Sequence, residues 1–216
     1  MASHLPAGVV RGDDEVARCY WCGADPLYQR YHDREWGFPV TDDQRLFEKI
    51  ALEGFQAGLS WLTILKKREN FRRAFHAFAL EKVARMGARD VKRLLGDAGI
   101  VRHRGKIEAT LQNARRALDL IERHGSLATF VWGFEPPARE RPRRLTRGAL
   151  RKLTETPSSR ALSKALRAEG FVFVGPTTMY AFMQAMGLVN DHLEGCATRE
   201  RALTRRARPR APGVGA

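Results

Sequence analysis

The chain has 216 residues, 44% of them hydrophobic, and a formal net charge of +14 at pH 7. This length fits one domain with or without extensions, and the hydrophobic content is enough for a sizeable core. No run approaches the ~18 consecutive apolar residues of a membrane span, and residues 1–15 lack the features of a signal peptide. We therefore expect a cytoplasmic protein with a polyanionic partner, no membrane partner, and cysteines that bind metal or are bystanders.

The positive charge is concentrated in two segments. Residues 139–152 carry seven basic side chains and one acidic one, and residues 199–210 carry six and one, so they hold +6 and +5 of the net charge of +14. Arg outnumbers Lys by 30 to 8, so a GC-rich genome explains the tail as well as a polyanionic partner does. Because residues 1–17 and 198–216 lack apolar periodicity, we predict a flexible N-terminal extension and a disordered Arg-rich tail around a domain at 18–197.

Two Cys–His pairs lie at opposite ends of this domain. Cys19 precedes His32 near the start, and His192 precedes Cys196 near the end. Zinc takes four nitrogen or sulfur ligands in a closed structural site, so these residues predict one zinc site that joins the two ends. An alternative stays open, because Cys19 and Cys22 form a C-x2-C pair whose spacing alone makes the better zinc half-site.

The first predicted helix begins at the capping box Thr41–Gln44 and runs to about Ala57. Glu53 lies seven residues after Leu46 and three after Ile50, so its carboxylate projects from the apolar face of this helix. A carboxylate buried there without a partner is energetically costly. Glu53 is therefore either a boundary residue paired with a nearby arginine or a pocket residue that accepts hydrogen bonds from a ligand or stabilises a cation.

Aromatic side chains are concentrated around Glu53 in the sequence. Tyr28, Tyr31 and Trp36 precede it, and Trp61 follows it. Most aromatic residues simply fill a core. A carboxylate with several flat rings nearby is, however, also what a pocket for a planar, electron-poor heterocycle needs.

Residues 94–107 are predicted to form the end of a short helix, a tight turn, and the start of a long helix that runs to Arg123. Such a helix–hairpin–helix unit presents backbone N–H groups and a helix N-terminus to one DNA phosphate. The candidate phosphate contacts are Gly99, Arg102, Arg104 and Lys106. The alternative is an ordinary pair of helices, the first of which ends in a glycine cap.

The remaining elements are also predicted to be mostly helical. Three further helices have start or stop signals: from Ser60 onward, from Ser158 or Ser159 to Gly170, and from Pro176 to about Met186. A loop is predicted at 136–142. Only Phe171–Val174 has the composition of a strand, and one strand makes no sheet, so the predicted fold class is all-α.

Together, these residues resemble the type I 3-methyladenine-DNA glycosylases of bacteria, a branch of the helix–hairpin–helix DNA glycosylases. Two of the matching motifs are CYWCGADPLYQRYHDREWG at 19–37 and DAGIVRHRGKI at 97–107, and the others lie at 46–70, 161–188 and 189–196. The resemblance covers roughly residues 18–197. It implies an all-α helix–hairpin–helix DNA glycosylase fold in which a structural zinc joins the terminal segments. The ligands of this zinc ion would be Cys19, His32, His192 and Cys196, and Cys22 would be a bystander.

The resemblance also implies roles for residues in and near a base-binding pocket. Glu53 would contact the methylated adenine, and Tyr31 and Trp61 would stack on it. The residues that would shape the pocket are Tyr28, Trp21 and Trp36. Leu59, at the turn after the Glu53 helix, would fill the gap in the DNA. Related glycosylases carry a catalytic aspartate after the hairpin, and the nearest acidic residues here, Glu108 and Asp119, do not suit that role.

The implied reaction is hydrolysis of the N-glycosidic bond of 3-methyladenine in alkylated double-stranded DNA, which leaves an abasic site in base excision repair. Alkylation at N3 puts a positive charge on the base, so the base leaves with little need for a strong acid or base. No lysine is an obvious Schiff-base nucleophile, and we expect a monofunctional, base-flipping enzyme that acts as a monomer. The competing interpretation is a non-catalytic, zinc-stabilised DNA-binding module, which does not explain a carboxylate among aromatic rings.

Overall fold

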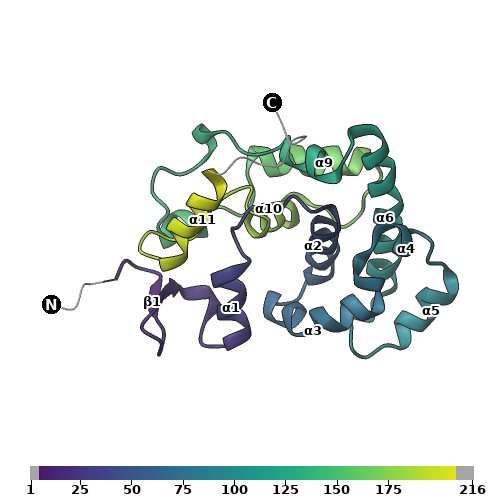
Figure 1. Cartoon of the computed structure of the whole chain (residues 1–216), viewed down its shortest axis with the longest axis horizontal. Coiled ribbons are helices and arrows are strands. Elements are labelled where there is room, and N and C mark those ends of the chain that lie inside the picture. The colour runs from purple at the N-terminus through teal and green to yellow at the C-terminus, as the bar shows by residue number, and fades with distance from the viewer. Residues whose placement is uncertain (1–4, 208–216) are drawn as a thin grey trace.

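The computed structural model describes residues 5–207, and this part of the chain is mostly helical (Figure 1). Its α-helices are α1 (Pro26–Arg34), α2 (Asp43–Gln56), α3 (Trp61–Ala74), α4 (Leu80–Ala84), α5 (Ala88–Gly96), α6 (Arg104–His124), α7 (Leu127–Trp132), α8 (Arg147–Arg151), α9 (Pro157–Ala168), α10 (Pro176–Ala185) and α11 (Ala197–Ala207). The short 3-10 helices are η1 (Tyr20–Cys22), η2 (His76–Phe78) and η3 (Ala138–Glu140). None of the helices in residues 5–207 is long and apolar enough to cross a membrane.

Helix α2 positions most of the functional residues because it runs through the core. It contacts α3, α6, α7 and α10, and it buries nearly every residue from Leu46 to Phe55 (Figure 1). The carboxylate of Asp42 caps its first turn by accepting a hydrogen bond of 2.8 Å from the backbone N–H of Arg45. At the other end the Lys106 ammonium donates to the carbonyl oxygens of Phe55 and Ala57, so α6 holds the C-terminus of α2.

The mostly helical structure agrees with the predicted fold class, and a two-stranded antiparallel sheet of β1 (Val9–Arg11) and β2 (Ala17–Cys19) is an addition that was not predicted. Val9 lies opposite Cys19 and packs in a small apolar cluster with Leu193 and Cys196. Described residues before position 18 are therefore anchored to the domain rather than flexible. Three-residue strands are too short to show an alternating pattern in the sequence, which is why the prediction missed them.

The prediction of a disordered tail is wrong for residues 198–207, which belong to α11. This helix contacts β2, so the two terminal segments lie side by side (Figure 1). Thr198 and Ala202 are buried one turn apart, and Arg206 forms an ion pair with Glu135. Two small buried side chains give too weak an apolar pattern to predict a helix. The rest of the predicted tail, 208–216, and residues 1–4 lie outside the described residues.

The segment Phe171–Val174 is not a strand, and it bends at Phe173. The side chain of Asn113 on α6 accepts from the backbone N–H of Val172 and donates to its carbonyl oxygen, both at 2.9 Å. Phe171 and Val174 are buried, while Phe173 has a φ of 58°. The Asn113 side chain therefore pairs with the backbone N–H and carbonyl groups of Val172, which would otherwise need a neighbouring strand as a partner.

Candidate active site and metal centre

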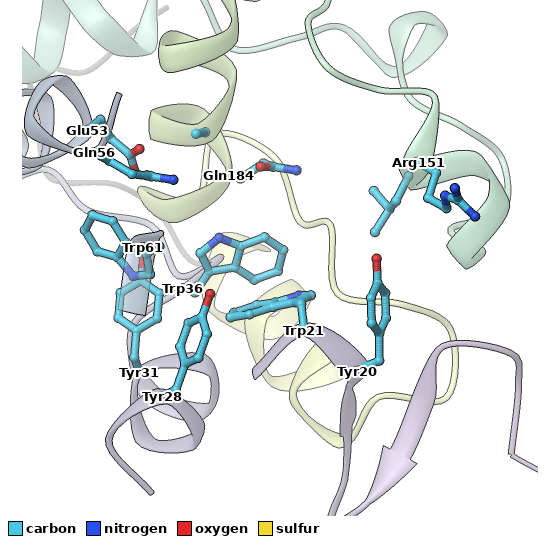
Figure 2. A pocket seen from close by; sticks show the side chains of 12 residues that line it. Tyr20, Trp21, Tyr28, Tyr31, Trp36, Glu53, Gln56, Trp61, Arg151 and Gln184 are labelled. Carbon is cyan, nitrogen blue, oxygen red and sulfur yellow. The ribbon is translucent and has the colours of Figure 1, made fainter. Parts of the chain in front are cut away.

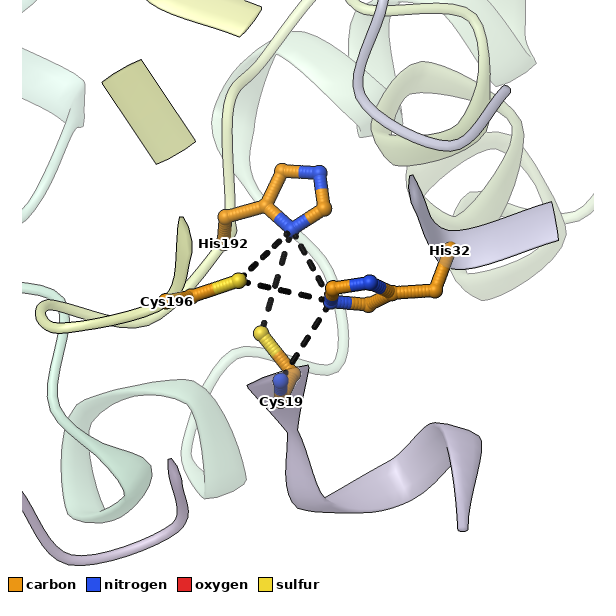
Figure 3. A group of neighbouring side chains, drawn as sticks. All are labelled: Cys19, His32, His192 and Cys196. Carbon is orange, nitrogen blue, oxygen red and sulfur yellow. Dashed lines mark hydrogen bonds between the residues drawn. The ribbon is translucent and has the colours of Figure 1, made fainter. Parts of the chain in front are cut away.

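The four predicted metal ligands come together in one buried cluster (Figure 3). One nitrogen or sulfur atom from each of Cys19, His32, His192 and Cys196 lies within 4.8 Å of all the others. His192 Nδ1 lies 3.2 Å from His32 Nε2, and Cys196 Sγ lies 3.5 Å and 3.6 Å from these two nitrogens. Tetrahedral ligands at the usual Zn–N and Zn–S distances lie about 3.3–3.8 Å apart. Cys19 Sγ lies slightly farther out, 3.9 Å from His192 Nδ1, so the cluster is close to these dimensions and could hold a metal ion.

Hydrogen bonds around the cluster orient both imidazoles. His32 Nδ1 lies 2.8 Å from the carboxylate of Asp33, and His192 Nε2 lies 2.9 Å from the carbonyl oxygen of Trp36. Arg18 in turn binds the Asp33 carboxylate at 2.8–3.0 Å. Metal-binding histidines commonly donate their second N–H to a carboxylate or carbonyl in this way. The other nitrogen of each ring thus faces the cluster, where it could bind a metal ion.

Cys22 lies outside this cluster. It is buried, and its thiol donates to the carbonyl oxygen of Cys19 at 3.2 Å. Cys19 supplies its sulfur to the cluster, whereas the sulfur of Cys22 is held against the backbone. Of the two arrangements that the sequence left open, the geometry favours His32 over Cys22 as the fourth ligand.

A cavity of about 270 Å³ brings together the six predicted base-contacting residues (Figure 2). These are Trp21, Tyr28, Tyr31, Trp36, Glu53 and Trp61. The other lining residues are Tyr20, Gln56, Leu150, Arg151, Ala181 and Gln184. The sequence offered no signal for the last four of these, because they come from helices α8 and α10, more than 80 residues after Trp61 along the chain.

The metal centre supports one wall of this cavity. The ring of Trp21 packs edge-on against His32 with centroids 5.2 Å apart, and the ring of Trp36 packs against His192 at 4.8 Å. The two tryptophans also contact each other at 4.9 Å. Two rings of the cavity therefore rest directly on the two histidines of the cluster.

Glu53 lies in the cavity wall with only 5% of its surface exposed. Its Oε1 pairs with the ammonium of Lys49 at 2.8 Å, one turn earlier on α2. Lys49 also donates to the hydroxyl of Tyr31 at 2.9 Å, and its nitrogen lies 3.2 Å from the centre of a ring of Trp61. No hydrogen bond from residues 5–207 reaches Oε2 of Glu53, which leaves that oxygen for a ligand.

Lys49 was not among the predicted site residues. The sequence predicted a nearby arginine as the alternative partner of Glu53. The partner in the structure is Lys49, four residues earlier on the same helix, and this spacing places two helical side chains together. Burial lowers the pKa of Lys49, and the facing carboxylate of Glu53 opposes this shift. Each buried charge therefore depends on the other.

The aromatic rings line the cavity as a continuous surface. Tyr31 contacts Trp61 with ring centroids 5.4 Å apart, and Tyr28 contacts Trp21 at 5.1 Å. Burial raises the pKa of Tyr28 to about 12, so its hydroxyl stays protonated at neutral pH. The indole N–H of Trp61 is buried without a hydrogen-bond partner in residues 5–207. A flat heterocycle with hydrogen-bonding edges suits this combination of rings, free donors and a carboxylate.

The predicted hairpin joins α5 to α6 through a turn at Gly99. The Gly99 N–H donates to the carboxylate of Asp97 at 2.7 Å, so this residue shapes the turn and offers no free donor of its own. The side chains of Arg102 and Arg104 are exposed beside the turn. Arg104 makes a long contact of 3.3 Å with the exposed Glu108 and stays accessible.

The structure corrects the prediction of a phosphate contact at Lys106. This residue is buried, and its ammonium donates to the carbonyl oxygens of Phe55 and Ala57 at 2.9 Å and 2.6 Å. Helical periodicity places Lys106 on the inner face of α6, beside Ile107 and Thr110. Lys106 thus fixes the start of the turn that carries Leu59.

Leu59 is 42% exposed at this turn between α2 and α3, directly after Gly58, whose φ is +83°. A large apolar side chain is costly to leave in water. Its position is compatible with the predicted insertion into DNA.

A hairpin with exposed arginines, beside an aromatic pocket that holds a buried carboxylate, defines the class as a DNA-binding protein with a site for a flat base. Comparison with known proteins gives the family. The model of the methyladenine glycosylase family matches residues 21–200. DNA-3-methyladenine glycosylase 1 of Escherichia coli (strain K12) is 54% identical over 182 residues, which are 84% of this chain and 96% of that protein.

Other similar proteins carry the same family name, 3-methyladenine DNA glycosylase. DNA-3-methyladenine glycosylase of Haemophilus influenzae (strain ATCC 51907 / DSM 11121 / KW20 / Rd) is 49% identical, with 84% of this chain and 97% of that protein covered. A crystal structure of 3-methyladenine DNA glycosylase I has a TM-score of 0.76 at 53% identity, covering 83% of this chain and 98% of that one. A variant of such an enzyme in complex with 3-methyladenine has a TM-score of 0.78 at 38% identity, covering 84% and 97%. The chain belongs to the methyladenine glycosylase family and is a DNA glycosylase, a hydrolase of DNA repair.

Proposed function

We propose that this protein hydrolyses the N-glycosidic bond of 3-methyladenine in alkylated double-stranded DNA, releases the free base and leaves an abasic site. The observation that carries the proposal is the buried Glu53, paired through Oε1 with Lys49, among the aromatic rings of the cavity. The relatives named above are 3-methyladenine glycosylases, one of them in complex with that base. One chain supplies the whole cavity, which supports action as a monomer.

The cationic charge of the substrate sets the mechanism. The enzyme flips the damaged nucleotide out of the duplex, and the base enters the cavity. Oε2 of Glu53 accepts a hydrogen bond from the edge of the base and stabilises its positive charge. Stacking on Tyr31 and Trp61 adds cation–π attraction of about 0.5–2 kcal/mol for each ring. Because the base already carries a positive charge, it leaves without protonation, and water completes the hydrolysis.

We infer that the reaction is monofunctional. A glycosylase that also cleaves the strand forms a Schiff base through a free amine. Lys49 is the lysine nearest to Glu53 in the described structure, and its ammonium is held by Glu53, Tyr31 and the ring of Trp61. The ammonium of Lys106 is likewise held, by two carbonyl oxygens. Neither of these two amines, which lie closest to the closed end of the cavity, is free to attack the sugar.

We propose further that zinc is the ion of the metal centre. Two cysteines and two histidines at tetrahedral spacing are a common structural zinc set, and all four positions are filled by protein. Bound zinc supplies a cross-link between the terminal segments and supports the wall of the cavity formed by Trp21 and Trp36. It takes no part in cleavage of the glycosidic bond.

The proposal is tested by chromatography of the bases released from methylated duplex DNA. We expect free 3-methyladenine, with the DNA strands intact until the abasic sites are cleaved by alkali. Assay of 3-methylguanine and 7-methylguanine in the same digest defines the substrate range. Tight binding to methylated DNA without release of any base would instead support the non-catalytic DNA-binding module.

Leu59→Ala tests the proposed insertion into DNA. We expect base release from duplex DNA to fall by about 10- to 100-fold, since deletion of most of an apolar side chain removes about 1.5–3 kcal/mol of burial. The affinity for free 3-methyladenine and the melting temperature should stay at the wild-type values, because Leu59 is exposed in the unbound protein. An equal loss of free-base affinity would show that Leu59 shapes the pocket instead.

A further inference from the structure

Helix α8 brings positive charge to the rim of the cavity. Arg151 and Leu150 line the cavity together with Tyr20 (Figure 2). Arg147, one turn earlier on the same helix, lies over Tyr20, with its guanidinium carbon 4.4 Å from the centre of the ring. Residues four apart share one face of a helix, so Arg147 and Arg151 both face the side of α8 that borders the cavity. Lys152 follows directly and is exposed.

The exposure of the lining residues shows which end of the cavity is open. Glu53 and Tyr31 are buried at one end, beside α2. At the other end Tyr20 is 37% exposed and Arg151 is exposed. Figure 2 shows Glu53 and Trp61 on one side and Arg151 and Tyr20 on the opposite side. The cavity is therefore closed beside α2 and open beside α8.

Most of the charge in residues 139–152 is free to bind a ligand. Arg141 pairs with Glu135, and Arg144 pairs with Glu194. The other five cations are exposed and have no acidic partner in residues 5–207: Arg139, Arg143, Arg147, Arg151 and Lys152. The net charge of +6 in this segment is thus largely uncompensated, and three of the free cations belong to α8 or follow it directly.

A flipped nucleotide remains joined to the strand on both sides, so its phosphates stay at the mouth of the pocket that holds its base. We propose that Arg147, Arg151 and Lys152 bind the DNA phosphates beside the flipped nucleotide. This inference rests on the proposed function for the presence of that nucleotide. The hairpin lies on the α2 side, where Lys106 of α6 holds the end of α2. The helix α8 and the hairpin therefore bind the backbone on opposite sides of the pocket.

The test is the salt dependence of binding to duplex DNA that contains an abasic-site analogue. For the triple variant R147Q/R151Q/K152Q, we expect the slope of log affinity against log salt to become shallower by about 2–3, because each phosphate contact contributes about 0.9. The affinity for free 3-methyladenine, followed by tryptophan fluorescence, should fall by a much smaller factor than the affinity for DNA, since Arg151 lines the rim of the cavity but the free base has no phosphate. The variant R147K/R151K keeps the charge and should keep the wild-type slope.

The matched control is R34Q/R45Q/R205Q, which removes three exposed arginines around a different cavity, next to α11. An unchanged slope in the α8 variant, or an equal change in this control, overturns the proposal. So does a loss of free-base affinity that matches the loss of DNA affinity, because α8 would then shape the pocket. If wild type fails to release 3-methyladenine while the α8 variant still loses slope, the DNA contact stands and the proposed reaction fails.

Discussion

Replacement of His32 by alanine is expected to empty the metal centre and to destabilise the whole domain. The ion would join Cys19 to His192, which are 173 residues apart in the chain. A cross-link over so long a loop stabilises a domain by about 3–5 kcal/mol, chiefly by restricting the unfolded chain. We expect about one zinc ion per chain in wild type and a large loss in His32→Ala, measured by elemental analysis together with the melting temperature.

Cys22→Ser is the matched control, since the Cys22 thiol binds only the carbonyl oxygen of Cys19. It should keep its zinc and its melting temperature. The opposite result, an empty site in Cys22→Ser and a filled one in His32→Ala, would assign the site to the C-x2-C pair. Because Trp21 packs on His32, the zinc-free protein should also bind free 3-methyladenine more weakly.

Lys49→Met is expected to lower both stability and base release. The substitution leaves the carboxylate of Glu53 buried without its counter-charge, which costs about 3–5 kcal/mol when one partner of a buried pair is removed. We therefore expect a loss of at least about tenfold in base release.

The measurement is kcat and KM for base release. Lys49→Arg keeps the positive charge and should restore part of the activity. Arg72→Met is the control, because it removes the cation that pairs with Glu48 on the same helix and leaves Glu53 untouched. Wild-type values of kcat and KM, with only a lower melting temperature, would make Lys49 a structural residue alone.

The site could be predicted from the sequence where its residues keep a local pattern. Cys19, His32, His192 and Cys196 were predicted from ligand type and placement, and the structure brings them together. Glu53 was predicted as a candidate pocket residue because its spacing from Leu46 and Ile50 places it on the apolar face of a helix. The aromatic residues, placed around Glu53 by order and resemblance, line one cavity with it.

Other features depend on contacts that no local pattern records. The position of Lys106 follows from which face of α6 meets α2, so a lysine in a basic motif serves as a helix cap instead of a phosphate contact. Arg151 reaches the rim of the cavity only through tertiary packing. Helix α11 and the β1–β2 hairpin bury too few side chains to leave a periodic signal. For Lys49, by contrast, the spacing from Glu53 was visible in the sequence.

The most direct test of the central claim, that Glu53 holds a cationic adenine for hydrolysis, is single-turnover release of 3-methyladenine from methylated duplex DNA by wild type and by Glu53→Gln. A hydrogen bond to a charged group is worth about 1.5–3 kcal/mol, so the account predicts release by wild type and a rate lower by about 10- to 100-fold in the variant. Equal rates of release by the two folded proteins would contradict it.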